Sequence, residues 1–414
     1  MMIKRRDFLK FLGVGTIVGF SSKAISAEIK HKVVVIGGGY SGSTCAKYLK
    51  LWGGESVEVT LIEKNSSYVS PILSNLVLNG QKSLSDITFS YAQHSNNYKI
   101  NVINKEVSSI NPDNKSITLD DSSILNYDRL VLATGIDFIQ TNEYDFSKIP
   151  HAWIAGEQTG ILKNQIDSMQ NGDTFLLTIP KSPYRCPPGP YERACVVADY
   201  LKNKKGYDNA RVIVLDENSD FVVEKDSFYK AFSSLGIYYY PNCKVTNVND
   251  TTKAISYEEN GVEKSLSAKV INVIPNQKAS KLIFDLGLND DSNFAPVDLL
   301  SYESLKVKNI HIIGDSHKSS QPKAGHIGNS EAKVCADAIL RLLNGYEPYS
   351  SPKTNSACYS PISSTTATWL SAVYKYDSVK KDMVKVSFDS GSASTNNYNE
   401  MFMWAGNLFA DTFR

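Results

Sequence analysis

Short apolar runs, separated by helical patterns, recur along most of this chain. Such runs are typical of strands buried in a parallel sheet. Two of them, His31–Ile36 and 57–62, enclose a predicted helix at 43–51. Further strand patterns follow at 102–119, which alternates like a small β-meander, and at 129–135 and 310–315, which end in small residues. The pattern predicts a strand–helix–strand unit that is completed by a later part of the chain.

A second unit of the same kind is predicted further along. Its strand, helix and strand are expected at 174–179, 192–201 and 210–215, and another helix at 325–340. The fold class is therefore α/β, with two Rossmann-like dinucleotide-binding-type domains. The residues from 351 onward, with Trp369 and several tyrosines, are consistent with a small C-terminal α+β interface domain.

The composition is that of an ordinary globular protein. With 42% hydrophobic and 21% charged residues in 414, it excludes disordered, collagenous and coiled-coil classes. Lys plus Arg number 44 against 43 Asp plus Glu, so there is no basic excess that would indicate a nucleic-acid partner.

Residues 1–27 have the features of a signal peptide. They combine a basic start, an apolar run at 11–20 and small residues near Ala27. The apolar run is too short to cross a bilayer, and KRRDFLK at 4–10 matches the twin-arginine pattern of folded-protein export. An amphipathic N-terminal anchor is the alternative. Removal of residues 1–27 takes the net charge from +1 to −3. We expect a periplasmic mature chain without a transmembrane span and with a cofactor inserted before export.

The turn after the first strand is rich in glycine. Gly37 permits a tight turn, Gly39 lets the backbone approach a pyrophosphate, and Gly42 lets the helix pack against the strand. Ser41 lies in the same turn, and Glu63 follows the second strand, where a carboxylate can accept hydrogen bonds from a ribose. Together these residues predict dinucleotide binding.

The first unit resembles the FAD domain of two-dinucleotide flavoproteins related to the disulfide reductases. The resemblance implies further FAD contacts at Val107, Thr134, Gly135, Gly314 and Asp315, with Asp315 on a ribityl hydroxyl.

The N-terminus of the 325–340 helix is expected to point at the flavin. Its dipole, together with the nearby Lys323, would favour an anionic reduced flavin. A solvated surface lysine is the alternative interpretation of Lys323.

The second unit lacks the expected glycines. Its turn at 184–192 reads YRCPPGPYE, and proline offers no N–H group to a pyrophosphate. NAD(P)H is therefore not expected as the electron source.

Two cysteines stand out by position. Cys186 lies in this turn, where the dipole of the following helix is expected to lower its pKa and favour the thiolate. Cys358 lies in a polar segment, and sequence spacing alone does not show whether the two meet. Four others have apolar neighbours and are expected to be small buried thiols: Cys45, Cys195, Cys243 and Cys335.

Metal and haem motifs do not occur in the sequence. It contains neither Cys-x-x-Cys nor Cys-x-x-Cys-His, and its six His residues lack metal-ligand spacing. We expect neither a metal site nor a covalently attached c-type haem.

At residues 186–193, CPPGPYER, the chain resembles the flavoprotein subunit of flavocytochrome c sulfide dehydrogenase, which is related to sulfide:quinone oxidoreductase. Three further motifs support the resemblance from about Lys30 to the C-terminus: VIPNQK at 273–278, PKAG at 322–325 with Asn329-Ser330, and ACYS at 357–360. The sequence as a whole predicts four regions: a signal peptide at 1–27, an FAD domain at 28–145 and 285–345, a second domain at 146–284 and an interface domain at 346–414.

The resemblance also implies the catalytic residues. Cys186 and Cys358 would form a redox-active disulfide beside the isoalloxazine, and Glu192 would be the acid–base group. A surface or helix-capping role is the competing interpretation of Glu192. The family type attaches FAD through a cysteine, and Pro71 stands at that position here, so non-covalent FAD is expected.

The implied function is periplasmic oxidation of sulfide to persulfide or sulfur, with electrons passed from the flavin to a separate c-type cytochrome subunit. One alternative is a sulfide:quinone oxidoreductase at the membrane surface, for which residues 400–414 would supply an apolar helix face. We favour packing of that face on its own domain or on a cytochrome. The other alternative is a non-catalytic exported flavoprotein.

Overall fold

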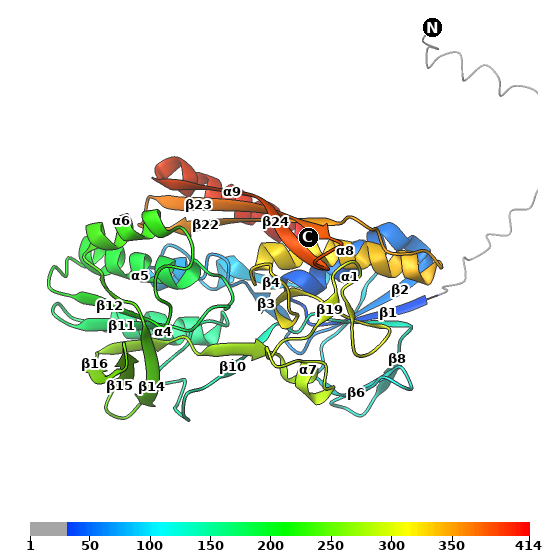
Figure 1. Cartoon of the computed structure of the whole chain (residues 1–414), viewed down its shortest axis with the longest axis horizontal. Helices are drawn as coiled ribbons and strands as arrows, with labels where there is room; N and C mark the ends of the chain where they lie inside the picture. Colours follow the sequence, from blue (N-terminus) through cyan, green and yellow to red (C-terminus); the bar gives the residue numbers. More distant parts are fainter. Residues whose placement is uncertain (1–30) are drawn as a thin grey trace, which may run out of the picture.

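The computed structural model describes residues 31–414, so the predicted signal peptide lies outside the described residues. Figure 1 shows two α/β units, with the C-terminal strands and helix lying along both.

The first unit is built on a seven-stranded sheet. Its strands are β1 (His31–Ile36), β2 (Val57–Ile62), β5 (Asn101–Ile103), β9 (Arg129–Leu132), β19 (Val297–Asp298), β20 (Glu303–Ser304) and β21 (Ile310–Ile312). The order is β19-β20-β21-β9-β1-β2-β5, parallel from β21 to β5 and antiparallel at β19 and β20. The predicted first and second strands are confirmed, and their side chains are buried except at the first two positions of β1 and the second position of β2.

Helices α1 (Tyr40–Gly53) and α8 (Gly325–Leu343) pack together beside this sheet. Both predicted helices are therefore confirmed, although each is longer than expected. The smaller helices of the unit are α2 (Asn75–Leu78), α3 (Ala92–Tyr98) and α7 (Lys281–Asp285), with 3-10 turns η2 (Gly54–Ser56), η3 (Ser85–Ile87) and η5 (Gly314–Ser316).

Two small antiparallel sheets complete the unit: β3 (Ser67–Val69) with β4 (Thr88–Ser90), and β6 (Val107–Asn111), β7 (Ser116–Leu119) and β8 (Ile124–Asn126). The predicted meander at 102–119 is thus displaced. Val102 belongs to β5, where it pairs with Leu61, because three residues suffice to extend the parallel sheet. The meander itself begins at Val107 and ends at Asn126.

The second unit has a parallel sheet of four strands. They are β11 (Thr174–Ile179), β12 (Arg211–Asp216), β13 (Tyr238–Tyr240) and β17 (Val270–Val273), in the order β13-β12-β11-β17. Its helices are α4 (Glu157–Asp167), α5 (Gly189–Asp199), the π-helix η4 (Tyr200–Lys204) and α6 (Lys225–Leu235), and a separate antiparallel sheet holds β14 (Cys243–Asn249), β15 (Ala254–Glu259) and β16 (Val262–Ser267). Every residue of α5 is buried, so this helix lies in the interior.

The chain passes between the two units through one antiparallel pair, β10 (Ile136–Ile139) with β18 (Asn276–Ala279). The predicted domain limits at 145 and 284 lie a few residues after these strands and stay predictions.

The C-terminal module consists of β22 (Lys353–Pro361), β23 (Ala367–Asp377), β24 (Asp382–Ser394) and α9 (Thr395–Phe413). In Figure 1 it extends from α6 to α8, and β22 contacts both α5 and α8. The apolar face of α9 is buried within the chain: Phe413 stacks on Phe89 with ring centroids 4.7 Å apart, and Leu408 and Phe409 lie in the same cluster. This face therefore packs on its own protein.

Within residues 31–414, helices long and apolar enough for a membrane span are not found.

Candidate active site

A pocket lies where the two units and the C-terminal module meet. Residues from the segment before α2, the turn before α5, the start of α8, β22 and α9 line it. The pocket brings together all three residues that the sequence analysis assigned to catalysis: Cys186, Glu192 and Cys358.

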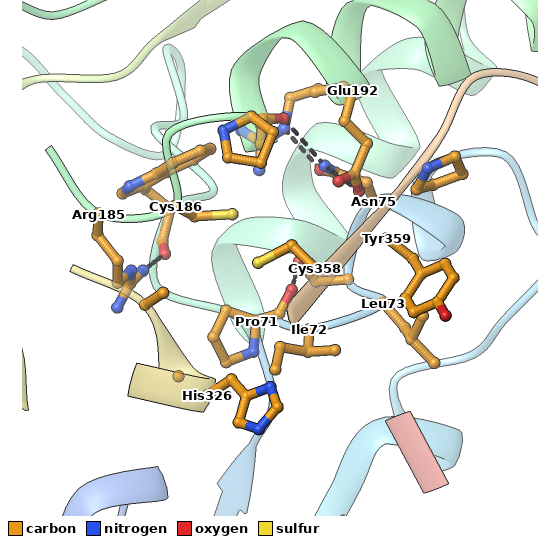
Figure 2. Close-up of a pocket in the computed structure, with 18 of the residues that line it drawn as sticks. Pro71, Ile72, Leu73, Asn75, Arg185, Cys186, Glu192, His326, Cys358 and Tyr359 are labelled. Carbon is orange, nitrogen blue, oxygen red and sulfur yellow. Dashed lines mark hydrogen bonds between the residues drawn. The ribbon is translucent and has the colours of Figure 1, made fainter. Parts of the chain in front are cut away.

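Figure 2 shows the sulfur atoms of Cys186 and Cys358 pointing toward one another. Cys186 has a left-handed backbone (φ 57°), and its N–H donates to the carbonyl of Lys323 at 2.7 Å. Cys358 lies in the middle of β22, opposite Leu370 of β23. Both are half-buried free thiols. The fold therefore brings together two cysteines whose proximity the sequence spacing could not reveal.

The predicted lowering of the Cys186 pKa is wrong. Burial raises it to about 12, and the charge of Glu192 raises it further, against smaller opposing effects from Arg185 and the Gly189 N–H. The cost of removing a thiolate from water is larger than these opposing effects. The pKa of Cys358 is likewise raised, first by burial and then by Cys186. An uncharged disulfide or a protonated dithiol suits this site better than a free thiolate.

Glu192 lies in the first turn of α5, and the residue is 9% exposed. Its Oε1 accepts a hydrogen bond from Nδ2 of Asn75 at 2.8 Å. Burial raises the pKa of Glu192 to about 8, although Asn75 and Arg193 favour the charged form. Glu192 is therefore not on the surface, and its carboxyl titrates where an acid–base group is useful.

Asn75 was missed in the sequence analysis. Its Oδ1 accepts from Nε of Arg193 at 2.9 Å, while its Nδ2 donates to Glu192 and to the Gly189 carbonyl. The guanidinium of Arg193 can only donate hydrogen bonds, so it must face the amide oxygen of Asn75. The NH₂ group of Asn75 is thereby directed toward Glu192. Arg193 is itself held by the side chain of Asn272 at 2.8 Å. Asn75 is 117 residues from Glu192, and the only local signal is a polar residue within an apolar run.

Four other pocket residues were also not singled out from the sequence: Trp153, Arg185, His326 and Trp404. Each lies at the boundary between regions that are distant in the chain. Ring stacking and hydrogen bonding, such as Trp404 Nε1 to His326 Nδ1 at 3.2 Å, assemble them only in the folded protein.

The glycine turn has the geometry that its sequence predicts. Gly37 has φ +101°, and a Cβ at Gly42 would lie 1.8 Å from the Gly37 carbonyl oxygen. Gly39 precedes the first turn of α1, whose N–H groups point outward from the helix end. Oε2 of Glu63 accepts from the Gly38 N–H at 2.8 Å. Glu63 thus anchors the turn.

The opposite side of this region is formed by η5. A Cβ at Gly314 would lie 2.4 Å from Oγ of Ser41, so these two residues pack directly against each other. Asp315 is half-buried, and burial raises its pKa. Its carboxylate makes no hydrogen bond to the described residues, which leaves it available to a ligand hydroxyl.

Lys323 is not a solvated surface residue. Its Nζ donates to the carbonyls of Asp315 and His317 at 2.9 and 2.8 Å and lies 3.7 Å from the ring centroid of Phe294. Burial lowers its pKa to about 8. Lys323 therefore holds the turn that carries Asp315.

The remaining predicted contacts lie on the same unit. Val107 begins β6, Thr134 bonds through Oγ1 to Oγ of Ser280, and Gly135 has φ +70° with open space at its α-carbon. Pro71 lines the pocket close to Cys358 (Figure 2).

These residues fit FAD. The N-cap residues of α1 and α8 are Gly39 and Ala324, which offer no capping side chain, so the first N–H groups of both helices remain for phosphate or flavin oxygens. The open Asp315 carboxylate fits a ribityl hydroxyl. As for metals, groups of three or more His, Cys, Asp or Glu with metal-binding geometry are not found in the described part of the chain.

The chain has the fold of the pyridine nucleotide–disulphide oxidoreductases, and the family model of that name matches residues 31–172. Two more specific models also match: the central domain of the sulfide dehydrogenase (flavocytochrome c) flavoprotein chain at 159–275, and the flavin-binding domain of flavocytochrome c sulphide dehydrogenase at 350–413. Models of two domains of the flavocytochrome c sulfide dehydrogenase flavoprotein chain thus match this chain, and the resemblance found from the sequence is confirmed.

Solved structures show the same fold. The sulfide:quinone oxidoreductase of Aquifex aeolicus is similar with a TM-score of 0.77 at 18% identity, over 92% of both chains. NDH2 of Plasmodium falciparum in complex with NADH has a TM-score of 0.71 at 14% identity, over 92% of this chain and 97% of that one. A ferredoxin reductase of Rhodopseudomonas palustris has a TM-score of 0.64 at 15% identity, over 87% and 91%.

Proposed function

We propose that this chain is the flavoprotein subunit of a periplasmic enzyme that oxidises sulfide to persulfide or sulfur through a Cys186–Cys358 disulfide and delivers the electrons to a separate c-type cytochrome. One observation carries the proposal. Two cysteines from distant parts of the chain face one another in a pocket that also holds the buried carboxyl of Glu192.

The chemistry of the chain's own residues is thiol–disulfide exchange. Hydrosulfide attacks one cysteine sulfur, a new S–S bond forms to the substrate, and the Cys186–Cys358 bond breaks with its electron pair on the other cysteine. The carboxylate of Glu192 takes the proton of the resulting persulfide. When the disulfide re-forms, zero-valent sulfur leaves, so each hydrosulfide gives up one proton and two electrons. FAD, when bound, would accept these two electrons.

An anaerobic titration tests this function. Stoichiometric sulfide is expected to bleach the flavin absorbance of the purified protein, whereas NADH leaves it unchanged, because the turn at 184–192 offers prolines instead of a phosphate-binding glycine turn. Reduction by NADH but not by sulfide would refute the proposal.

We further propose that the FAD is held without a covalent bond, because Pro71 has no nucleophile to attach it. Trichloroacetic acid is expected to release nearly all of the flavin into the supernatant, as measured by its absorbance. Flavin that stays with the precipitate after digestion with protease, on a single peptide, would contradict non-covalent binding.

The rate of flavin reduction by sulfide is expected to depend on Glu192. Its pKa of about 8 means that the base form, and with it the rate, increases as the pH rises through this value. Glu192→Gln should abolish this increase with pH and lower the rate at high pH by about 10²-fold or more. Asn75→Leu removes a hydrogen-bond donor that lowers the pKa of Glu192, so the increase in rate should move to higher pH. Stopped-flow absorbance over a pH series measures the rates of both variants. An unchanged increase of the rate with pH in Glu192→Gln would contradict the assignment.

The acceptor is proposed to be a c-type cytochrome on another polypeptide, since this sequence contains no haem-attachment motif. The structural likeness to a protein named sulfide:quinone oxidoreductase favours a quinone as the second candidate. Sulfide-reduced protein mixed with either a c-type cytochrome or a soluble quinone analogue distinguishes the two, because only the true acceptor re-oxidises the flavin rapidly.

A further inference from the structure

Strand β22, which carries Cys358, lies at the edge of its sheet. The sheet order is β22-β23-β24, so β22 pairs with another strand of this sheet on one side only. On β22, the Ala357 N–H donates to Nδ1 of His326 at 3.0 Å. The Asn355 N–H donates to Oγ of Ser330 at 3.1 Å. Side chains of α8 thus take the place of strand carbonyls and fix β22 to this helix.

The spacing of these two contacts follows from the regular geometry of both elements. His326 and Ser330 are four residues apart and lie on one face of α8, one turn apart. Asn355 and Ala357 are two residues apart on β22, and alternate N–H groups of a strand point to the same edge. The last contact of this row is made at the residue directly before Cys358.

His326 also binds α9. Its Nδ1 accepts a second hydrogen bond, from Nε1 of Trp404 at 3.2 Å. Trp404 packs on Tyr359, which follows Cys358, with ring centroids 5.7 Å apart. His326, Trp404 and Cys358 all line the pocket, and Figure 2 shows the histidine and the cysteine in it. One ring nitrogen therefore joins α8, β22 and α9 at the pocket wall.

The two donors determine where the ring hydrogen of His326 lies. Covalent geometry fixes the hydrogens of a backbone N–H and of an indole N–H, and both point at Nδ1, which must be the acceptor. A hydrogen on Nδ1 would clash with both and could reach only the Ala357 carbonyl, at 3.3 Å. The ring is therefore neutral, with its hydrogen on Nε2.

The charges around His326 agree with a neutral ring. Burial is the largest effect on the pKa of His326 and lowers it. Lys333 on α8 lowers this pKa further, whereas Asp411 on α9 raises it, and these two residues form an ion pair with each other at 2.7 Å.

The other cysteine is fixed to the same stretch of chain. The Cys186 N–H donates to the carbonyl of Lys323 at 2.7 Å, and Lys323 is three residues before His326. Residues 323–326, at the start of α8, thus hold the backbone of Cys186 directly and that of Cys358 through its neighbour Ala357. The two sulfur atoms point toward one another between these two attachments.

We propose that His326 is a positioning residue for the redox pair: as a neutral ring with its hydrogen on Nε2, it holds β22 where the sulfur of Cys358 meets that of Cys186. The inference rests on the proposed redox disulfide and adds the side chain that brings its second cysteine into place.

Nitrogen-15 NMR of the unsubstituted, FAD-loaded protein tests the state of the ring and does not depend on whether a variant folds. The His326 ring is assigned through its backbone resonances. At about pH 6 an ordinary imidazole is largely protonated, but His326 should have a hydrogen on Nε2 and none on Nδ1. A charged ring, or a hydrogen on Nδ1, would overturn the inference.

The disulfide equilibrium tests the positioning role. The FAD-loaded protein is equilibrated without oxygen in mixtures of oxidised and reduced dithiothreitol, and mass spectrometry measures its Cys186–Cys358 disulfide. His326→Leu removes the acceptor of the Ala357 N–H, so Cys358 is less often in place. The equilibrium constant for disulfide formation should fall about three- to tenfold. His326→Asn is the matched variant, because its Oδ1 can accept where Nδ1 does, and should stay within about twofold.

The outcomes separate the inference from the proposed function. Equal constants in His326→Leu and the unsubstituted protein, or equal losses in His326→Leu and His326→Asn, would overturn the positioning role. The expected ranking of the variants, with no bleaching of the flavin by sulfide, would refute the proposed function and leave the positioning role standing. Absence of the disulfide at every ratio of oxidised to reduced dithiothreitol would refute both.

Discussion

Replacement of Cys186 or Cys358 by serine is expected to reduce the rate of flavin reduction by sulfide at least about 10³-fold, while FAD remains bound. Each variant removes one end of the disulfide that hydrosulfide must attack. A serine hydroxyl cannot form the S–S bond or leave as a stabilised anion at this buried position. Both side chains are half-buried at a pocket wall, so the exchange of sulfur for oxygen leaves the fold intact.

Cys243→Ser is a suitable control for these variants. Cys243 is buried in a different cluster, and its Sγ already donates to the Pro241 carbonyl, so serine can keep a partner there. Its rate should stay within about twofold of the unsubstituted protein. Stopped-flow absorbance measures the rates, and the ratio of flavin to protein absorbance measures FAD content. Normal reduction in both Cys186→Ser and Cys358→Ser would rule out the disulfide mechanism.

The parts of the fold that the sequence predicts well are those in which local pattern and burial agree. Strand β11 was predicted to the residue, since all six of its side chains are buried. Prediction was weaker where a few residues extend a sheet, as Val102 does in β5. At such positions the structure depends on pairing with a strand that is distant in the sequence, and the local alternation of apolar and polar residues does not indicate that pairing.

The site shows the same division. Cys186 and Glu192 come from one motif, but their meeting with Cys358 was available only through a family resemblance. Asn75 was missed because its partner Glu192 lies 117 residues away. The predicted direction of the Cys186 pKa shift was wrong because a sequence shows the helix that follows a thiol but not the burial that raises the pKa of that thiol.

Gly42→Ala is expected to destabilise the first unit by about 3–5 kcal/mol and to reduce FAD content to less than about a tenth. The added Cβ would lie 1.8 Å from the Gly37 carbonyl oxygen. That oxygen belongs to the backbone between β1 and α1, so no side-chain rotation relieves the clash. Either α1 moves away from β1 or the turn at Gly37 opens, and each change displaces the N–H groups that would hold the pyrophosphate.

Gly406→Ala provides the matched control, because it makes the same substitution inside α9, where a Cβ would meet no atom within 4 Å. Alanine there should stabilise the protein by about 0.5–1 kcal/mol through helix propensity, with FAD content unchanged. Urea unfolding followed by circular dichroism, together with the flavin-to-protein absorbance ratio, compares the two variants. Equal FAD content in Gly42→Ala and Gly406→Ala would mean that the close approach of α1 to the Gly37 turn does not shape the FAD site. The binding of the pyrophosphate would then have to be assigned to the α8 side, where Gly314 packs on Ser41.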